Sequence, residues 1–442
     1  MGIILTILYT AIFVLLIYKI NFFNIDGISK KTLSAIFILK ILAGIFLILI
    51  YKYYYHTRSN ADIFKYFDDG NIIFSAIYNN PIDYLRMISG IDANSPHLMK
   101  YYDSACFWIK NFNYDLYNDN RTVIRFNAIV RLFSFGYISV HTVFMCFFSF
   151  TGLTAIFKLF YQFFKNKKIG FIIAIYFVPS VILWSSGILK EGLLIFAFGL
   201  MLYSFMKLLD KKLKIKYFIV FIGSIFLLLI SKFYVLIAAI PGLIFLLWVK
   251  TTNNKNLFAK FIIVHFAFLL LAFNTQLVSK YDFTQILSKK QHDFISMVDS
   301  SHNVGSKIQI PILEPNIFSI TKNTPNALFN TFFRPSIFEI HSPIVLLAAF
   351  ENLIIFLLMI LSIAFFNKKE LKNKLLFFCI SYVLILFTLT GLTTPVLGAL
   401  VRYKTPALPF LFIIFLFIID VEKMRLFWKR ILRRREAVDS RQ

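Results

Sequence analysis

Apolar runs of membrane-spanning length recur along the whole of this 442-residue chain. Hydrophobic residues make up 59% of it and charged residues only 16%, and its mean hydropathy is +0.73. A helix needs about 20 apolar residues to cross a bilayer, and it satisfies its own backbone hydrogen bonds in lipid. The sequence therefore predicts an all-α, multi-pass integral membrane protein. About eleven transmembrane helices are expected, at 2–19, 33–52, 138–162, 169–187, 192–209, 217–231, 233–249, 257–276, 342–366, 375–392 and 404–421.

The basic residues indicate how these helices are oriented. Lys and Arg (47) outnumber Asp and Glu (22), and they concentrate in short loops between alternate helix pairs and in the tail 422–442. Under the positive-inside rule such loops face the cytoplasm. We therefore expect a bacterial-type inner or plasma membrane protein, with the N-terminus outside and the C-terminus in the cytoplasm. The expected partner of the positive charge is the lipid bilayer, not nucleic acid. The loop clusters are Lys30/Lys31, Lys165/Lys167/Lys168, Lys211/Lys212/Lys214/Lys216, Lys250/Lys255 and Lys368/Lys369/Lys372/Lys374.

Two segments, 53–137 and 277–341, are too long and too polar for turns, and both fall on the extracytoplasmic side of this topology. The first contains amphipathic stretches at 72–88 and 122–135, which predict helices lying along the interface. The second carries several prolines and is expected to be mostly irregular. The simplest organisation is a single polytopic membrane domain, 1–442, with two elaborated outer loops.

An acidic segment, 59–70, directly follows an apolar run and carries Asp62, Asp68 and Asp69. If it is helical, Asp62 and Asp69 lie on one face with Lys65 close to both. One interpretation is that a carboxylate acts as a general base, or that the acids hold a divalent cation. The other is an interfacial helix with internal ion pairs. Eight Asp residues lie in 53–137, so chance proximity is easy and both interpretations stay open.

Ionisable residues also appear where outer helix ends should meet. Lys190 and Glu191 interrupt an apolar stretch that also holds a proline and two glycines, and charged groups at membrane depth are costly and usually functional. The alternative is a tight helical hairpin whose lysine reaches the lipid headgroups.

A second outer connection, 394–406, carries Arg402 and Lys404. An arginine presents a planar, bidentate donor that suits phosphate oxygens, although a basic residue beside lipid phosphates needs no special role. Arg334 and Lys232 are weaker candidates for the same phosphate-binding role. Glu351, inside the helix 342–366, is either a buried ion-pair partner or a catalytic group.

This layout resembles the GT-C class of membrane glycosyltransferases, which use sugars carried on polyprenyl phosphate. The likeness rests on the acid-bearing first outer loop around Asp62 to Asp69, on interfacial helices in that loop, and on basic residues in later outer loops. It implies that Asp62, Asp68 or Asp69 accepts the proton of the attacking hydroxyl, while Lys190, Arg402 and Arg334 bind the departing lipid phosphate. The implied partners are a polyprenyl-phosphate-linked sugar and a glycan acceptor. The helix 2–19 ahead of the loop departs from the pattern.

Other functions fit the same composition. A Wzy-like polysaccharide polymerase or an O-antigen-ligase-like enzyme would depend on Arg334 and Arg402 more than on any single Asp. A lipid or glycan transporter or flippase would use short, broken helices as a midplane site, and a scaffold would need no chemistry. The sequence has no P-loop, no GxGxxG after a strand and no GxSxG elbow, so nucleotide-driven and hydrolase chemistry have no motif here.

Overall fold

A computed structural model describes residues 1–55, 58, 61–109, 117–210, 214–277, 281–300 and 306–439. Within these residues the protein is all α-helical, and isolated bridges are the only β pairing. Eight of the described helices are long and apolar enough to cross a membrane, which confirms an all-α protein of membrane type. The count of eleven stays a prediction. The eight are α1 (Gly2–Lys19), α2 with its π-helical end (Lys30–Tyr54), α7 with η4 (Ile138–Phe163), α10 (Lys190–Leu209), α11 (Ile215–Thr251), α15 (Pro343–Ala364), α16 (Lys374–Thr393) and α17 through α18 (Leu397–Ile418).

The remaining expected spans are shorter or broken in the structure. The helix α12 (Leu257–Phe273) has 17 residues. The expected span 169–187 consists of α8 (Lys168–Ile172), a π-helical turn and α9 (Pro179–Trp184), because Pro179 begins a new helix at its N1 position. In α11 the backbone leaves helical geometry at Lys232, with φ −151° and ψ 88°. That break falls between the two helices expected at 217–231 and 233–249.

The chain divides into two compact units. Unit 1 comprises Met1–Lys168 and Ile175–Leu236, and unit 2 comprises Ile169–Ala174 and Ile237–Gln442. The residues Ser59 and Asn60 of the acidic segment, and Lys211 and Lys212 of one basic loop, lie outside the described residues.

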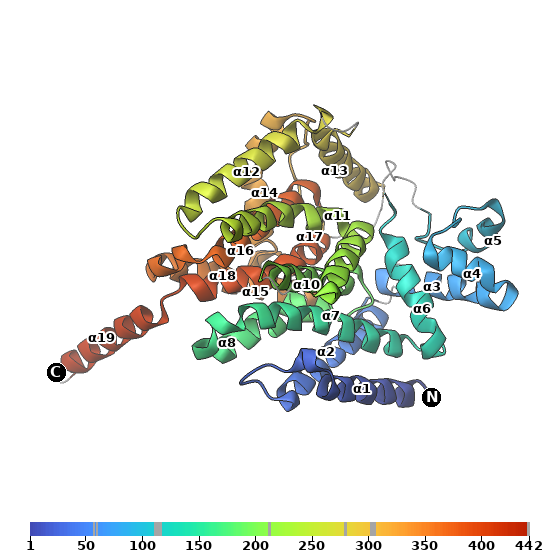
Figure 1. Ribbon diagram of the computed structural model, residues 1–442, viewed down its shortest axis with the longest axis horizontal. Coiled ribbons are helices and arrows are strands. Elements are labelled where there is room, and N and C mark those ends of the chain that lie inside the picture. The colour runs from blue at the N-terminus through green and yellow to red at the C-terminus, as the bar shows by residue number, and fades with distance from the viewer. Residues whose placement is uncertain are drawn as a thin grey trace. The chain divides into compact units, whose positions relative to one another are not determined.

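Unit 1 is built around α7, which packs against α1, α2 and α10 (Figure 1). Its contact with α10 is backbone to backbone, because Gly152 and Gly199 face each other with no side chain between them. Small residues allow helices in lipid to approach this closely. Aromatic rings fill the contacts with α1 and α2: the Phe13 and Phe147 rings stack with centroids 4.3 Å apart.

The first long segment folds into α3 (Asp62–Asn79), α4 (Pro81–Ser89), α5 (Met99–Tyr102) and α6 (Asn120–Ser134). The two expected amphipathic stretches are therefore helical. The helices α3 and α6 lie side by side, and Gly70 of α3 makes room for the Asn127 backbone and Cβ (Figure 1). Asn80 caps α4, where Pro81 occupies the first helical position.

Unit 2 centres on α16, which packs against α14, α18 and α13. The expectation that 277–341 is mostly irregular is wrong, because α13 (Phe283–Asp299) and α14 (Ile317–Phe333) occupy much of it. Pro315 and Pro335 flank α14, Pro325 lies inside it, and Pro343 occupies the first turn of α15. Backbone hydrogen bonds join Ile308 to Pro395 and Leu397 to Ser306, which fastens this segment to the start of α17.

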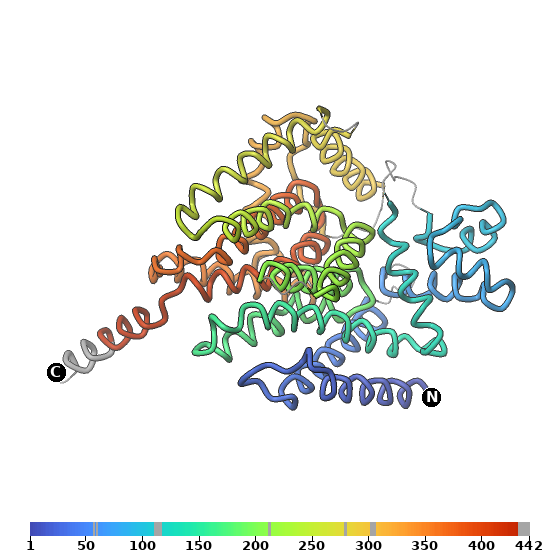
Figure 2. The backbone as a smooth tube through the Cα atoms, in the orientation of Figure 1, coloured from blue at the N-terminus to red at the C-terminus, as the bar shows by residue number. Residues whose placement is uncertain are grey.

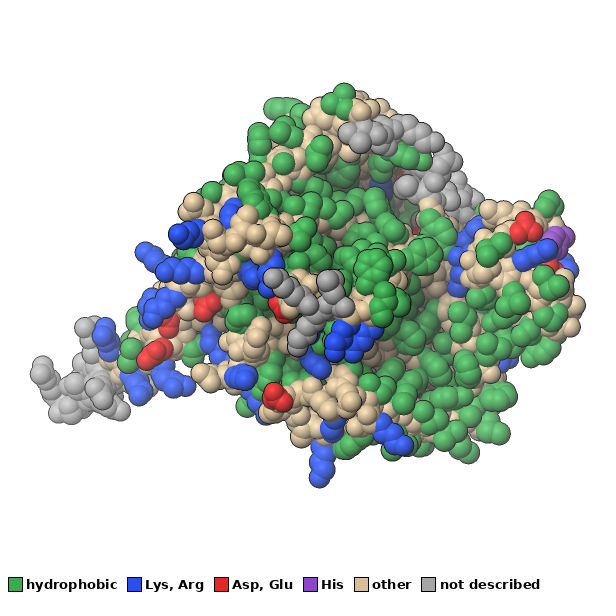
Figure 3. Space-filling model, viewed as in Figure 1, with side chains coloured by type: hydrophobic (Ala, Val, Ile, Leu, Met, Phe, Trp, Pro, Cys, Tyr) green, Lys and Arg blue, Asp and Glu red, His purple; other side chains and the backbone are tan. Residues whose placement is uncertain are grey.

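The described part of the basic tail is helical, since α19 (Val421–Asp439) continues the chain after α18 (Figure 2). Lys and Arg side chains gather on the part of α19 whose side chains are described, whereas hydrophobic side chains cover much of the rest of the face shown in Figure 3. Large apolar residues are exposed along α1 and α12, as expected of helices that face lipid.

Candidate functional site

A buried charge contact in unit 1 joins Asp119, Lys190 and Lys232. The Asp119 carboxylate lies 2.7 Å from the Lys190 ammonium and 3.8 Å from that of Lys232. Both lysine side chains are more than nine-tenths buried, and Asp119 is 20% exposed. These residues come from three distant parts of the sequence, so the fold brings two lysines to one carboxylate. We refer to this group as the Lys–Asp–Lys cluster.

The break in α11 places Lys232 in this cluster. A helix break leaves carbonyl groups without their usual partners, and the Ile230 carbonyl accepts a hydrogen bond of 2.5 Å from the Thr122 hydroxyl in the first turn of α6. Next to Thr122, Asn120 accepts a hydrogen bond of 2.9 Å from the Tyr66 hydroxyl of α3. The Tyr66 ring in turn lies 5.9 Å from the Lys190 ammonium. The helices α3, α6 and α11 are thus tied together around the two lysines.

One face of α2, formed by residues 40, 44 and 47, positions the turn that precedes Lys190. On this face the Lys40 ammonium donates a hydrogen bond to the Ser185 hydroxyl. Gly44 lets the backbone of the turn come close, because a Cβ added at Gly44 would lie 2.7 Å from the Ser186 carbonyl oxygen. One turn further on, a Cβ at Gly187 would lie 2.6 Å from the Leu47 side chain. Positions 40, 44 and 47 share one helix face. This face therefore holds the turn 185–187, which leads directly into Lys190.

Helix ends add to the positive potential of the cluster. Lys190 is the first residue of α10 and Asp119 is the N-cap of α6. Helix N-termini carry exposed N–H groups and a partial positive charge, and both attract anions. Two lysines and two helix N-termini therefore favour a bound oxyanion such as a phosphate. Glu191, buried in the first turn of α10, is an acid where the helix dipole favours one.

The three acids expected at the site have different surroundings. Asp68 is 45% exposed and pairs with Arg58 at 2.8 Å. Asp69 is fully buried and accepts the backbone N–H groups of Cys106 and Phe107, each at 2.8 Å. Asp62 begins α3, one turn before Tyr66 on the same helix face, and is partly buried. Asp62 and Asp69 both lie on the α3 face that carries Tyr66 and leads to the Lys–Asp–Lys cluster, but Asp69 is held by two backbone amides.

Asp69 anchors the loop that carries Cys106. Burial raises the pKa of Asp69, and the two backbone N–H donors act against that rise. A buried carboxylate held by two backbone amides stabilises the turn that contains them. All three cysteines lie among the described residues, and Cys106 is exposed whereas Cys146 and Cys379 are buried.

The basic residues expected from the later outer loops belong to unit 2. Arg334 forms an ion pair and a hydrogen bond with Glu339, which also closes a capping box with Ser336. Lys404 is fully buried and donates to the Thr331 carbonyl at 3.0 Å and to the Asn352 side chain at 2.7 Å. Glu351 is buried as well.

Arg402 is partly buried in α17. The described geometry therefore gives Arg334 and Lys404 structural partners within unit 2.

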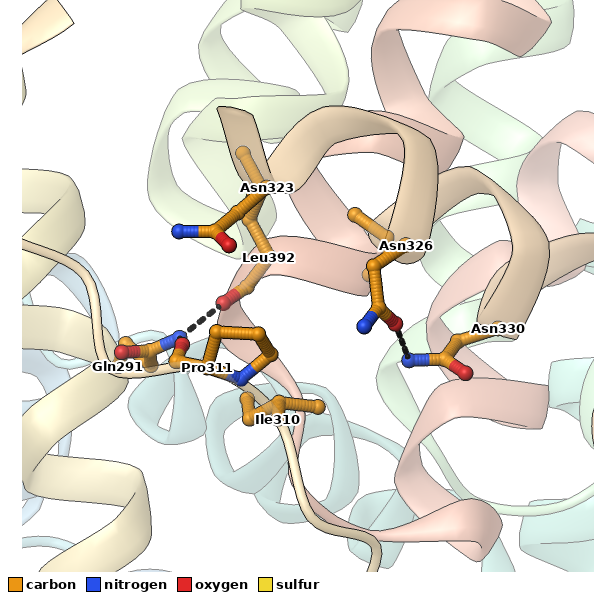
Figure 4. A pocket seen from close by; sticks show the side chains of 9 residues that line it. Gln291, Ile310, Pro311, Asn323, Asn326, Asn330 and Leu392 are labelled. Atoms are coloured by element: carbon orange, nitrogen blue, oxygen red, sulfur yellow. Dashed lines mark hydrogen bonds between the residues drawn. The ribbon is translucent and has the colours of Figure 1, made fainter. Parts of the chain in front are cut away.

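A small pocket in unit 2 is lined by four side-chain amides together with apolar residues (Figure 4). The Gln291 amide donates to the Leu392 carbonyl at 2.7 Å and to the Pro311 carbonyl at 3.0 Å, and its oxygen accepts from Leu313. Asn330 donates to Asn326 at 2.8 Å. Gln291 therefore joins α13 to the segment 311–313 and to the end of α16, whereas the Asn330–Asn326 bond lies within α14.

Sequence reasoning missed Asp119 and Lys40. Asp119 is one of eight Asp in its segment, and only the fold shows that it meets Lys190 and Lys232. Lys40 had a usable signal, because it is the one charged residue in the apolar run 33–49. For the expected divalent cation, the described residues contain no group of three His, Cys, Asp or Glu side chains that could hold a metal ion.

No family model, curated protein or solved structure matches this chain.

Proposed function

We propose that this protein is a membrane glycosyltransferase that moves a sugar from a polyprenyl-phosphate donor to an extracytoplasmic or lipid-linked glycan acceptor. The observation that carries the proposal is the Lys–Asp–Lys cluster, in which two buried lysines meet one carboxylate at two helix N-termini. The cluster belongs to the same unit as several long apolar helices, within reach of a donor whose lipid tail stays in the bilayer.

The chemistry follows from the charge that develops during transfer. The acceptor oxygen forms a bond to the sugar C1 as the bond from C1 to the phosphate oxygen breaks, and both electrons of that bond leave with the polyprenyl phosphate. Lys190 and Lys232 stabilise the added negative charge in a poorly solvated site. Asp119 holds the two ammonium groups in place. Asp62 takes the proton of the attacking hydroxyl.

The first test is to compare lipid-linked and surface glycans from cells with and without the chain by mass spectrometry. If the chain is a transferase, cells without it should contain a glycan that lacks one sugar, because the acceptor accumulates unmodified. Identical profiles in the two strains would refute the proposal.

Replacing Lys190 or Lys232 by Gln should raise the donor concentration needed for half-maximal transfer by about tenfold or more, since a charge-assisted hydrogen bond contributes roughly 1.5–3 kcal/mol. The measurement is a donor titration in membranes that contain matched amounts of protein. Lys100→Gln is the control. Lys100 is an exposed lysine of the same unit, and its described partner is the Tyr101 ring. Superimposable titration curves for all three variants would remove both lysines from the phosphate site.

A transporter or flippase is the second candidate, and the break in α11 at Lys232 favours it. Broken helices with ionisable residues form substrate sites in transporters. The two functions differ in their product, because transfer makes a new glycosidic bond and transport does not. Purified chain in liposomes that moves a lipid-linked glycan across the bilayer without changing its mass would support transport over transfer.

A further inference from the structure

A pair of arginines lies on α6 just beyond the Lys–Asp–Lys cluster. Arg121 and Arg125 are one helical turn apart, and both guanidinium groups lie over the buried Trp108 ring, at 5.0 and 5.4 Å from its centroid. Like charges at this spacing repel each other. Burial, and then the charge of Arg125, lower the pKa of Arg121. The fold thus holds two positive charges together in a partly buried place.

The described contacts of these arginines are with neutral groups. Arg121 donates to the Trp108 carbonyl at 3.0 Å and to the Asn94 side chain at 3.2 Å. Arg125 donates to the Met87 carbonyl at 2.8 Å and to the Tyr117 hydroxyl. Within the part of the chain that the structure describes, neither arginine forms an ion pair with a carboxylate. Each guanidinium has five N–H donors, so both keep donors for a further acceptor.

Two polar side chains flank this pair. Asn94 and Tyr117 are exposed, and each is bonded to one of the two arginines. An amide and a phenol beside two planar cations suit a ligand that combines hydroxyl groups with an oxyanion, such as an acidic sugar. From Asp119 to Arg125 the rise along the α6 axis is roughly 9 Å. The pair is therefore near the cluster but separate from it.

We propose that Arg121 and Arg125 form an oxyanion subsite that binds the carboxylate of an acidic sugar in the acceptor glycan. That the bound sugar belongs to an acceptor rests on the proposed transferase function. The shared chemistry is an oxyanion, which a uronic acid carboxylate or a phosphate can supply. The cost of holding the two cations together falls when that anion binds, because the anion offsets their mutual repulsion.

The test is binding of D-glucuronate and D-glucose to the full chain in nanodiscs, measured by saturation-transfer NMR, with inorganic phosphate as competitor. Glucuronate should bind and glucose should not. Arg125→Gln, and the double variant Arg121→Gln/Arg125→Gln, should weaken glucuronate binding at least about tenfold. Arg125→Lys keeps the charge but loses the planar guanidinium. Its affinity for glucuronate should therefore lie between that of the native chain and that of Arg125→Gln. The control is Arg131→Gln, which removes a guanidinium from the same helix beside the Phe74 ring.

Three outcomes would overturn the subsite: equal binding of glucose and glucuronate, unchanged glucuronate binding in the double variant, or an equal loss in Arg131→Gln. Competition by phosphate at concentrations far below those at which glucuronate binds is a further informative result. It would assign the arginine pair to a phosphate and refute its role in acceptor binding. The assay contains no donor. A chain that binds glucuronate through these arginines but leaves cellular glycans unchanged on deletion would therefore refute the transferase and keep the subsite.

Discussion

Replacing Gly152 by Val should prevent unit 1 from folding stably. An added Cβ at Gly152 would overlap the Ile195 carbonyl oxygen, and one at Gly199 would overlap the Gly152 carbonyl oxygen. Both obstacles are backbone atoms of a neighbouring helix, so relief requires α7 and α10 to move apart. Overpacking costs about 3 kcal/mol or more in such a place. We expect little folded protein by size-exclusion chromatography in detergent, and a melting temperature lower by roughly ten degrees in what remains.

Gly223 supplies the matched control for this prediction. It also lies in an apolar helix of unit 1, and no atom lies within 4 Å of a Cβ added there. Gly223→Ala should therefore leave the melting temperature unchanged or slightly higher, because alanine favours the helix over glycine by about 1 kcal/mol. Equal behaviour of Gly152→Val and Gly223→Ala would show that α7 and α10 do not touch at Gly152.

Asp62→Asn should lower transfer by about 10²–10⁴-fold, the usual contribution of a positioned general base, while the protein accumulates normally. The amide keeps the size of the side chain but cannot take a proton from the attacking hydroxyl. The measurement is the rate of glycan product formation in membranes, normalised to folded protein.

Two neighbours in the same helix distinguish this effect from others. Asp68→Asn removes an exposed carboxylate paired with an exposed arginine, and such pairs contribute little, so activity should stay near normal. Asp69→Asn replaces one acceptor oxygen with an N–H donor that faces a backbone N–H, so it should lower the amount of folded protein by destabilising the loop at Cys106. Full activity in Asp62→Asn would exclude Asp62 as the base.

Much of the fold could be predicted because lipid leaves few choices. The helix expected at 2–19 is α1, and the separation of two helices at Lys232 coincides with the break in α11. The helices of the second long segment could not be predicted from its prolines, because a proline in a sequence does not show whether it breaks a helix or flanks one. Most of them flank α14 or begin α15, where the missing N–H costs nothing.

The candidate site was harder to predict, because it depends on contacts between residues far apart in sequence. Lys190 and Lys232 stood out as ionisable residues in apolar stretches, but nothing in the sequence singles out Asp119 as their shared partner. Likewise, spacing alone cannot show that Asp69 accepts hydrogen bonds from two backbone amides.

The Asp69 anchor also has a practical use. It holds the backbone of Cys106 while that thiol stays exposed, and the other two thiols of the chain are buried. The unmodified protein thus carries its own reporter of sidedness. A membrane-impermeant maleimide applied to intact cells should label the native chain if the segment 53–137 is extracytoplasmic, with Cys106→Ser as the blank, and labelling only after cell lysis would reverse the orientation assigned to every loop.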